Sequence, residues 1–179
     1  MIRTIHSLPI PVIAAVNGHA IGLGFAIAAA CDLRVAGPGA TFADGFVKRG
    51  ISGCELGLSY FLPRIVGPAV PHELMLTGRR VRADEALAIG LVSSVTDDVD
   101  GATNELVSAL AENAPAAVSM TKEVMWANLH ASSLEQALAL EARTQSLLRV
   151  TSDAQEAQKA FLEKRAPQFG DRPTKRPLR

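Results

Sequence analysis

Aromatic side chains and cysteines are both scarce in this chain. One Trp, one Tyr and six Phe among 179 residues leave a core that must be built mainly from Ala, Val, Leu and Ile. The two cysteines, Cys31 and Cys54, are too few for a disulfide framework, and the four histidines have no spacing typical of a metal site. We therefore expect a cytoplasmic protein in a reducing compartment, with no bound metal.

Net charge and long apolar runs are lacking as well. Eighteen Lys and Arg balance eighteen Asp and Glu, which argues against a general nucleic-acid partner. Asn17, His19 and Asp32 interrupt the longest apolar run, so it falls short of the roughly 20 residues of a membrane span. Residues 171–179 are the exception to the charge balance, and we expect this basic segment to be a flexible tail.

The most informative stretch lies at residues 10–36. Residues 10–16 are apolar and rich in β-branched side chains, which is typical of a buried strand. A turn signal at residues 17–18 (Asn-Gly) and the sequence Gly-Leu-Gly at 22–24 follow, and an alanine-rich apolar helix is expected over 25–31. Such a turn leaves backbone N–H groups at a helix N-terminus, where they attract a negatively charged ligand oxygen.

A phosphate fits this turn poorly. No Lys follows either glycine, as a P-loop requires, and Ile27 stands where the dinucleotide fingerprint needs Gly or Ala. Asp44, 20 residues after Gly24, keeps a nucleotide site open as a minor alternative.

The first part of the chain alternates strand and helix signals, and the rest is helical only. We expect strands or extended pieces at 32–36, 41–42, 46–48 and 91–95, and helices at 55–66, 68–76 and 83–89. Further helices are expected at 102–112, 115–129, 133–150 and 153–165, the last two opened by capping boxes at Ser133 and Ser152. The sequence thus predicts an α/β core over 1–99, a helical region over 100–170 and the tail.

The stretch at 10–36 resembles the signature of the crotonase superfamily, the enoyl-CoA hydratases and isomerases. The similarity continues, in order, through residues 40–42, 47–50, 62–67, 76–79, 83–92 and 160–169. It implies a crotonase-like α/β fold, a ββα superhelix that is incomplete at its N-terminus because the similarity begins inside the family's sequence. The helical C-terminal region is implied to form a trimer interface.

The resemblance also implies the ligand. The partner is an acyl-CoA thioester, so coenzyme A is part of the substrate and no separate cofactor is expected. Phe161 and Lys164 match family positions near the acyl-CoA nucleotide. An apolar anchor of the last helix and a solvated cation at its end are the alternatives for these two residues.

Enzymes of this family polarise the thioester carbonyl with two backbone N–H groups, an oxyanion hole that stabilises enolate-like charge. The resemblance assigns one donor to Leu23, flanked by Gly22 and Gly24, where Leu replaces the family's usual glycine. A backbone donor tolerates this replacement if φ is negative. The second donor belongs to a part of the family that precedes the similarity. Alternatively, the two glycines only permit close packing of strand and helix.

The two glutamates of the hydratases are missing from this sequence. Their positions in the family motifs fall on Ala26 and Phe46, whose methyl and benzyl groups cannot move protons. Hydration is therefore not expected, and both residues are assigned to the substrate-binding surface.

Glu55, eight residues before Pro63, resembles the single catalytic glutamate of the 3-enoyl-CoA to 2-enoyl-CoA isomerases. Apolar neighbours at 54, 56, 58 and 61 are expected to desolvate its carboxylate, as a proton shuttle near neutral pH requires. Alternatively, Ser52 and Glu55 form a capping box that opens the helix at 55–66. Asp44 is a second possible acid, for which a turn aspartate is the default interpretation.

Two functions follow from these residues. The first is an acyl-CoA isomerase of fatty acid metabolism that shifts a double bond through a thioester enolate. The second is a non-catalytic crotonase-fold remnant that binds acyl-CoA or serves in an oligomer. In both cases we expect that the protein is not a monomer, because helix faces with Leu134, Leu138 and Leu140 expose apolar area. The resemblance implies that the closed form is a homo-trimer or a dimer of trimers.

Overall fold

The computed structural model describes residues 1–170. These residues form two compact units. The first unit contains Met1–Leu8 and Val12–Leu106, and the second contains Pro9–Pro11 and the chain from Val107 onward. The division falls inside helix α6 (Val99–Ala111), and the roles assigned to the predicted domains stay predictions. The predicted tail, 171–179, lies outside the described residues.

The first unit is built on two three-stranded sheets. In the sheet of order β1-β3-β6 the neighbouring strands are parallel; it contains β1 (Ile13–Val16), β3 (Leu33–Ala36) and β6 (Ser94–Val95). In the sheet of order β2-β4-β5, β2 (His19–Ile21) runs parallel to β4 (Thr41–Ala43), and β5 (Val81–Arg82) runs antiparallel to β4.

Consecutive strands enter different sheets, and this sets the architecture. The chain places β1 in one sheet and β2 in the other, and then forms α2 (Leu23–Ala30). It repeats the order with β3, β4 and, after a short 3-10 helix η1 (Val47–Arg49), α3 (Leu58–Val66). The structure thus contains two turns of a ββα superhelix, which confirms the expected fold class.

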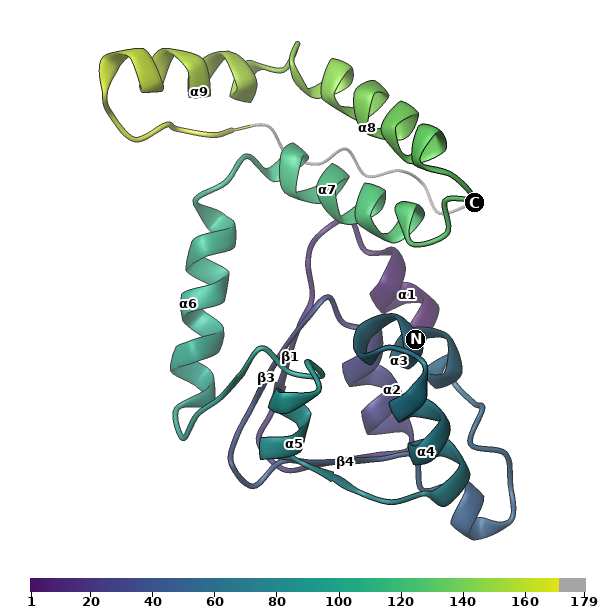
Figure 1. Cartoon of the computed structure of the whole chain (residues 1–179). Coiled ribbons are helices and arrows are strands. Elements are labelled where there is room, and N and C mark those ends of the chain that lie inside the picture. Colours follow the sequence, from purple (N-terminus) through teal and green to yellow (C-terminus); the bar gives the residue numbers. More distant parts are fainter. Residues whose placement is uncertain (171–179) are drawn as a thin grey trace. The chain divides into compact units, whose positions relative to one another are not determined.

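The remaining helices complete the two units. The first unit adds α1 (Ile2–Ser7), α4 (Ala69–Thr77), α5 (Ala83–Ala88) and the start of α6. The second unit contains α7 (Pro115–Asn128), α8 (Leu134–Leu148) and α9 (Ser152–Glu163), and α7 packs against α8 (Figure 1).

Helix α2 forms the centre of the first unit's core. Five of its eight residues are buried, namely Phe25, Ala26, Ala28, Ala29 and Ala30. Small alanine side chains let neighbouring elements approach the helix closely, while the Phe25 ring packs 5.6 Å from that of Phe42 on β4. The predicted buried, alanine-rich helix is therefore confirmed.

The structure corrects the predictions for residues 46–48 and 10–16 and adds one strand that was not expected. Residues 46–48 are not extended, because Gly45 (φ +73°) and Gly50 (φ +77°) turn the chain on either side of η1. The strand predicted at 10–16 begins only at Ile13, and it is half exposed because β1 lies at the edge of its sheet. Strand β2 was not expected, since the turn signal and the glycines conceal its three residues.

One of the two predicted capping boxes is displaced. Ser133 caps α8 as expected, since its hydroxyl accepts the N–H of Gln136 at 3.2 Å. Helix α9 is capped by Thr151, whose hydroxyl accepts the N–H of Ala154 at 3.2 Å, so the cap predicted at Ser152 is wrong by one residue.

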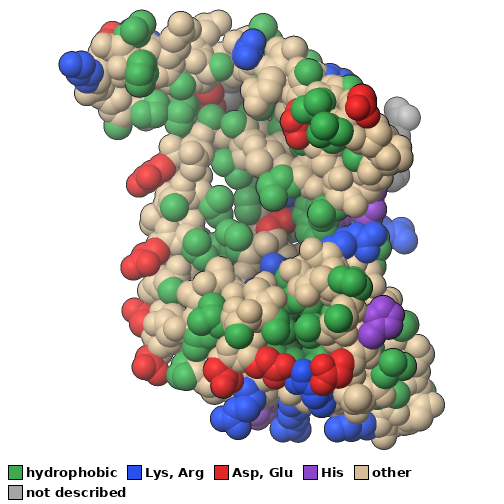
Figure 2. Space-filling model, viewed as in Figure 1, with side chains coloured by type: hydrophobic (Ala, Val, Ile, Leu, Met, Phe, Trp, Pro, Cys, Tyr) green, Lys and Arg blue, Asp and Glu red, His purple; other side chains and the backbone are tan. Residues whose placement is uncertain are grey.

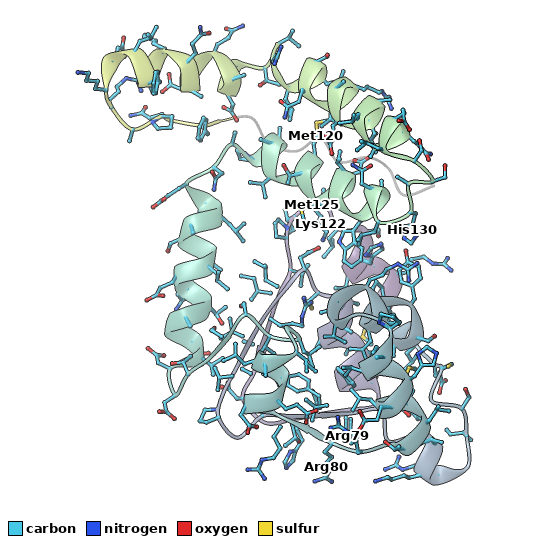
Figure 3. The ribbon with its side chains drawn as sticks, in the orientation of Figure 1. Arg79, Arg80, Met120, Lys122, Met125 and His130 are labelled. Carbon is cyan, nitrogen blue, oxygen red and sulfur yellow. The ribbon has the colours of Figure 1, made fainter. Side chains whose placement is uncertain are left out.

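A short N-terminal segment belongs to the second unit. Lys122 on α7 is buried, and its Nζ donates a hydrogen bond to the carbonyl of Ile10 at 3.0 Å. Figure 3 shows Lys122 near Met120 and Met125 on the same helix. This bond lies within the second unit, to which Pro9–Pro11 belong although its other residues begin about 100 positions later.

Charged side chains connect α4 to α5. The Nε of Arg79 lies 2.6 Å from Glu73 on α4, and its Nη2 lies 2.7 Å from Glu85 on α5. These hydrogen-bonded carboxylates raise the pKa of Arg79. Acidic and basic groups alternate on the lower edge of the molecule in Figure 2, where Figure 3 places Arg79 and Arg80.

The guanidinium of Arg34, on β3, donates hydrogen bonds mainly to backbone carbonyl oxygens. Its Nε donates to the carbonyl of Leu91 at 2.7 Å, and its Nη1 donates to the carbonyl of Cys31 at 2.5 Å. Longer bonds of 3.4 Å reach the carbonyls of Ala28 and Asp32. Burial lowers the pKa of Arg34, and the charge of Asp32 opposes this shift.

We predict that Arg34→Met lowers the free energy of unfolding by about 2–4 kcal/mol, because it leaves several part-buried carbonyls without a donor. Urea denaturation measures this loss. Arg80→Met, at an exposed arginine, is the matched control and should change stability by less than about 0.5 kcal/mol. Equal stabilities of the two variants would contradict the assigned role.

Candidate functional site

The N-terminus of α2 presents backbone donors. Gly22 is the N-cap residue, and its N–H donates to the carbonyl of Ala43 at 2.9 Å. The first helical bond runs from the N–H of Ala26 to the carbonyl of Gly22 at 3.0 Å. The N–H groups of Leu23, Gly24 and Phe25 precede that bond and have no acceptor within the helix.

Leu23 suits the role of a backbone donor. It is the first residue of α2 and is not among the described residues with positive φ, so the leucine is tolerated at this position. Its side chain is 44% exposed, which places the start of the helix at the surface of the described chain.

Phe46 packs against this turn. A Cβ atom on Gly22 would stand 3.2 Å from Cζ of Phe46 and 3.5 Å from the carbonyl oxygen of Asp44. Gly22 also has a φ of +56°, so both its conformation and its surroundings require glycine. A Cβ on Gly24 would meet only the Cβ of Ala20, at 4.0 Å, so close packing does not explain this second glycine.

Ala26 lies one turn further along α2 and is only 1% exposed. The structure therefore brings together Gly22, Leu23 and Phe46 at the helix start, with Ala26 buried behind them. Neither Ala26 nor Phe46 carries a side-chain group that can accept a proton.

Glu55 lies in the loop before α3 and does not cap this helix. Helix α3 begins at Leu58, because Leu56 (φ +54°) and Gly57 (φ +81°) interrupt the helical path. The hydroxyl of Ser52 accepts the N–H of Cys54 at 3.0 Å, and Gly57 is the N-cap residue without a side-chain bond. The predicted capping box at Ser52 and Glu55, and the helix start at residue 55, are therefore wrong.

The expected desolvation of Glu55 is not observed in the described chain. Glu55 and Cys54 are both exposed, while Leu58 and Phe61 turn into the core. The carboxylate is thus accessible from solvent, where a ligand can reach it.

Asp44, which the sequence marks only as a turn residue and a second possible acid, is fully buried. It is 0% exposed, and neither carboxylate oxygen has a hydrogen-bond partner. Burial raises the pKa of Asp44, and the negative charge of Glu55 raises it further. The N–H groups of Phe46 and Val47 oppose this shift, although neither meets hydrogen-bond geometry with an Asp44 oxygen.

The carboxyl of Asp44 lies against the loop that carries Glu55. A Cβ on Gly53 would stand 2.6 Å from Oδ2 of Asp44 and 2.9 Å from the carbonyl oxygen of Met75. The N–H of Glu55 in turn donates to the carbonyl of Gly53 at 3.0 Å. Asp44 therefore touches the α2 turn through its backbone and the Glu55 loop through its side chain.

A hollow of about 440 Å³ runs along β1, β2 and α2 in the first unit. It is lined by residues 12–20 together with Ile5, Gly24, Ile27, Ala28 and Cys31. Gly24 is the only residue of the predicted site within this lining.

Phe161 and Lys164 belong to the second unit. Phe161 on α9 is 82% exposed, and Lys164 is the C-cap residue of that helix with a φ of +53°. Beyond it the chain folds back, since Arg165 pairs with Glu156 and the N–H of Gly170 donates to Asp153 at 2.8 Å. Contact of Phe161 and Lys164 with a nucleotide stays a prediction.

Residues 1–170 contain neither a candidate metal-binding cluster nor a candidate membrane-spanning helix. Within that part of the chain no group of three His, Cys, Asp or Glu side chains is arranged to hold a metal ion. None of the helices there is both long and apolar enough to cross a membrane.

Comparison with known proteins gives consistent matches. A family model described as enoyl-CoA hydratase/isomerase matches residues 1–172. A protein named probable enoyl-CoA hydratase from Mycobacterium tuberculosis is 42% identical over 174 residues, which are 96% of this chain and 60% of that protein. A short-chain-enoyl-CoA hydratase from Clostridium acetobutylicum is 36% identical and is matched over 91% of this chain and 62% of its own.

Solved structures agree with these matches. The crystal structure of a probable enoyl-CoA hydratase/isomerase from Mycobacterium abscessus has a TM-score of 0.88 at 40% identity, covering 96% of this chain and 66% of that one. The chain thus spans about 60% of the length of the first of these relatives. The match of the family model over nearly the whole sequence shows that this chain belongs to the enoyl-CoA hydratase/isomerase family, whose members have the crotonase fold.

Proposed function

We propose that this chain binds an acyl-CoA thioester at the start of α2 and isomerises its double bond. The observation that carries the proposal is the exposed N-terminus of α2, where Leu23 offers an N–H without a helical acceptor. Such a group stabilises negative charge on a carbonyl oxygen. A cytoplasmic location is part of the proposal, because two cysteines are too few for the disulfide framework of a small secreted domain.

The reaction needs one base. The carboxylate of Glu55 removes a proton from C2 of a 3-enoyl thioester, and the electron pair of the C2–H bond moves into the enolate, whose oxygen faces the N–H of Leu23. Return of the same proton to C4 shifts the double bond to C2–C3 with no net gain or loss of atoms. The exposed loop position of Glu55 supports this role, because a proton acceptor must reach the substrate.

We predict that Glu55→Gln lowers the rate of isomerisation at least about 100-fold, the usual effect of losing a general base, while acyl-CoA binding changes little. Formation of the conjugated 2-enoyl thioester, followed by ultraviolet absorbance, measures the rate. Glu105→Gln, at an exposed glutamate of α6, is the matched control. If Glu55→Gln retains full activity, the base must be another group.

Hydration of 2-enoyl-CoA should be negligible, although the relatives described above are named hydratases. Ala26 and Phe46 supply no carboxylate to activate water, and Ala26 is buried. Loss of the conjugated absorbance of a 2-enoyl thioester measures hydration. The double variant Ala26→Glu with Phe46→Glu restores both carboxylates and tests the assignment directly, and circular dichroism checks that this variant still folds. Rapid hydration by the unmodified chain would show that these two positions are misassigned.

A second candidate is a non-catalytic acyl-CoA-binding protein. The absence of carboxylates at Ala26 and Phe46 favours it. Titration calorimetry with an acyl-CoA, combined with the isomerisation assay, separates the two functions, because the second predicts binding without turnover.

We also propose that the chain forms a homo-trimer or a dimer of trimers. Large apolar side chains are exposed on α8 and α9, including Leu134, Leu138 and Leu162, and Figure 2 shows apolar groups at their surface. Solvent exposure of this kind indicates an interaction surface. The mass measured by sedimentation should be three or six times 18.9 kDa. Leu138→Lys should lower this mass, because it places a charge on the apolar surface. A single 18.9 kDa species at micromolar concentration would contradict the proposal.

A further inference from the structure

Asp44 is an exception to the rule that buried polar groups are paired. Its side chain is completely buried, and both of its oxygens lack a hydrogen-bond partner. An ionised carboxylate is strongly unfavourable in such a place, whereas the protonated form is only a polar group. The burial and the missing partners therefore favour a carboxyl that keeps its proton.

The charged groups around Asp44 strengthen this argument. Glu55, from the loop before α3, is the charged residue whose field acts on the carboxyl. On η1, Lys48 and Arg49 are exposed, and on α4, His72 and Glu73 are exposed as well. Within residues 1–170 no cation forms an ion pair with Asp44 that would hold it in the charged form.

The contact between Asp44 and Gly53 connects this carboxyl to the proposed base. Oδ2 of Asp44 lies 2.6 Å from the point where a Cβ on Gly53 would stand, so the loop rests directly on the carboxyl. Glu55 follows two residues later, and its N–H is bonded to the carbonyl of Gly53. A change in the charge of Asp44 therefore acts both on the loop backbone and on the carboxylate that the loop carries.

We propose that Asp44 is a positioning residue that stays protonated at neutral pH, supports the Gly53 loop as a neutral group and leaves Glu55 as the single negative charge of the two. The part concerning Glu55 rests on the proposed isomerase function. Asp44 itself does not touch the substrate, because it is fully buried. Its proton is held and not transferred.

If Asp44 stays protonated in the folded chain, the stability of that chain changes with pH in a direction that can be measured. Below the ordinary pKa of an aspartate, both the folded and the unfolded chain hold the proton. Above it, the unfolded chain releases the proton and the folded chain keeps it, so stability falls until the pH passes the raised pKa of the folded state. Within this window the unfolding constant rises up to tenfold per pH unit.

The first experiment compares the unmodified chain, Asp44→Asn and Asp97→Asn by urea denaturation between about pH 3.5 and about pH 8. Asp97 is exposed, which makes it the matched control. Asp44→Asn should gain stability relative to the unmodified chain as the pH rises, whatever constant offset the amide introduces. Asp97→Asn should run parallel to the unmodified chain. A parallel course for Asp44→Asn, or a growing loss with pH, would overturn the proposal.

A second measurement covers the case in which Asp44→Asn does not fold. In the unmodified chain labelled with carbon-13 at aspartate carboxyls, one resonance should remain protonated at neutral pH. Glu55→Gln should move the titration of this resonance to lower pH, because it removes a neighbouring negative charge, whereas Glu105→Gln should not. Absence of a protonated aspartate, or equal effects of both variants, would contradict the proposal.

The third arm tests the positioning role through activity. Isomerisation by the unmodified chain should decline at alkaline pH as Asp44 ionises, and Asp44→Asn should lose this decline. Identical pH profiles would leave Asp44 a buried acid without influence on Glu55 and would overturn the positioning role. If no preparation turns over substrate, the isomerase proposal fails, while the first two measurements still decide whether Asp44 holds a proton.

Discussion

The first unit depends on how α2 is held at its two ends. At the C-terminal end, the guanidinium of Arg34 donates to the carbonyls of Cys31 and Leu91, so one side chain fixes the end of the helix to the segment that precedes β6. At the other end, the N–H of Gly22 is bonded to the carbonyl of Ala43 on β4. With both ends fixed to the sheets, the first amides of α2 have a defined direction, as preorganised donors require.

The candidate site combines a helix start that is held by backbone contacts with acidic side chains that lie on loops. The helix start is determined by glycine geometry and by Phe46, and it offers only backbone groups. The acidic groups lie elsewhere, on the loops before η1 and α3. Ala26 and Phe46 supply no side-chain group for proton transfer at the helix or beside it, so the proposed reaction depends on Glu55 and on what surrounds it.

Much of the fold was predictable because local signals agreed with tertiary structure. The alanine-rich helix, the cap at Ser133 and the end of α4 at Gly78 (φ +61°) all follow from local sequence. The capping box at Ser52 failed because Leu56 adopts a left-handed conformation that its sequence does not indicate. The burial of Asp44 could not be predicted, since it depends on how the loop at Gly53 packs against the carboxyl, which no local sequence signal indicates.

The second unit is discontinuous in sequence, and the bond between Lys122 and Ile10 joins its two segments. The chain leaves the first unit after Leu8, returns at Val12 and leaves again inside α6, so three peptide connections join the two units. A cut in α6 therefore does not release the second unit whole. A fragment that begins at Val107 lacks residues 9–11, and the ammonium of Lys122 then loses the carbonyl that accepts its hydrogen bond. Fragments designed from the linear order of the helices would divide a folded unit.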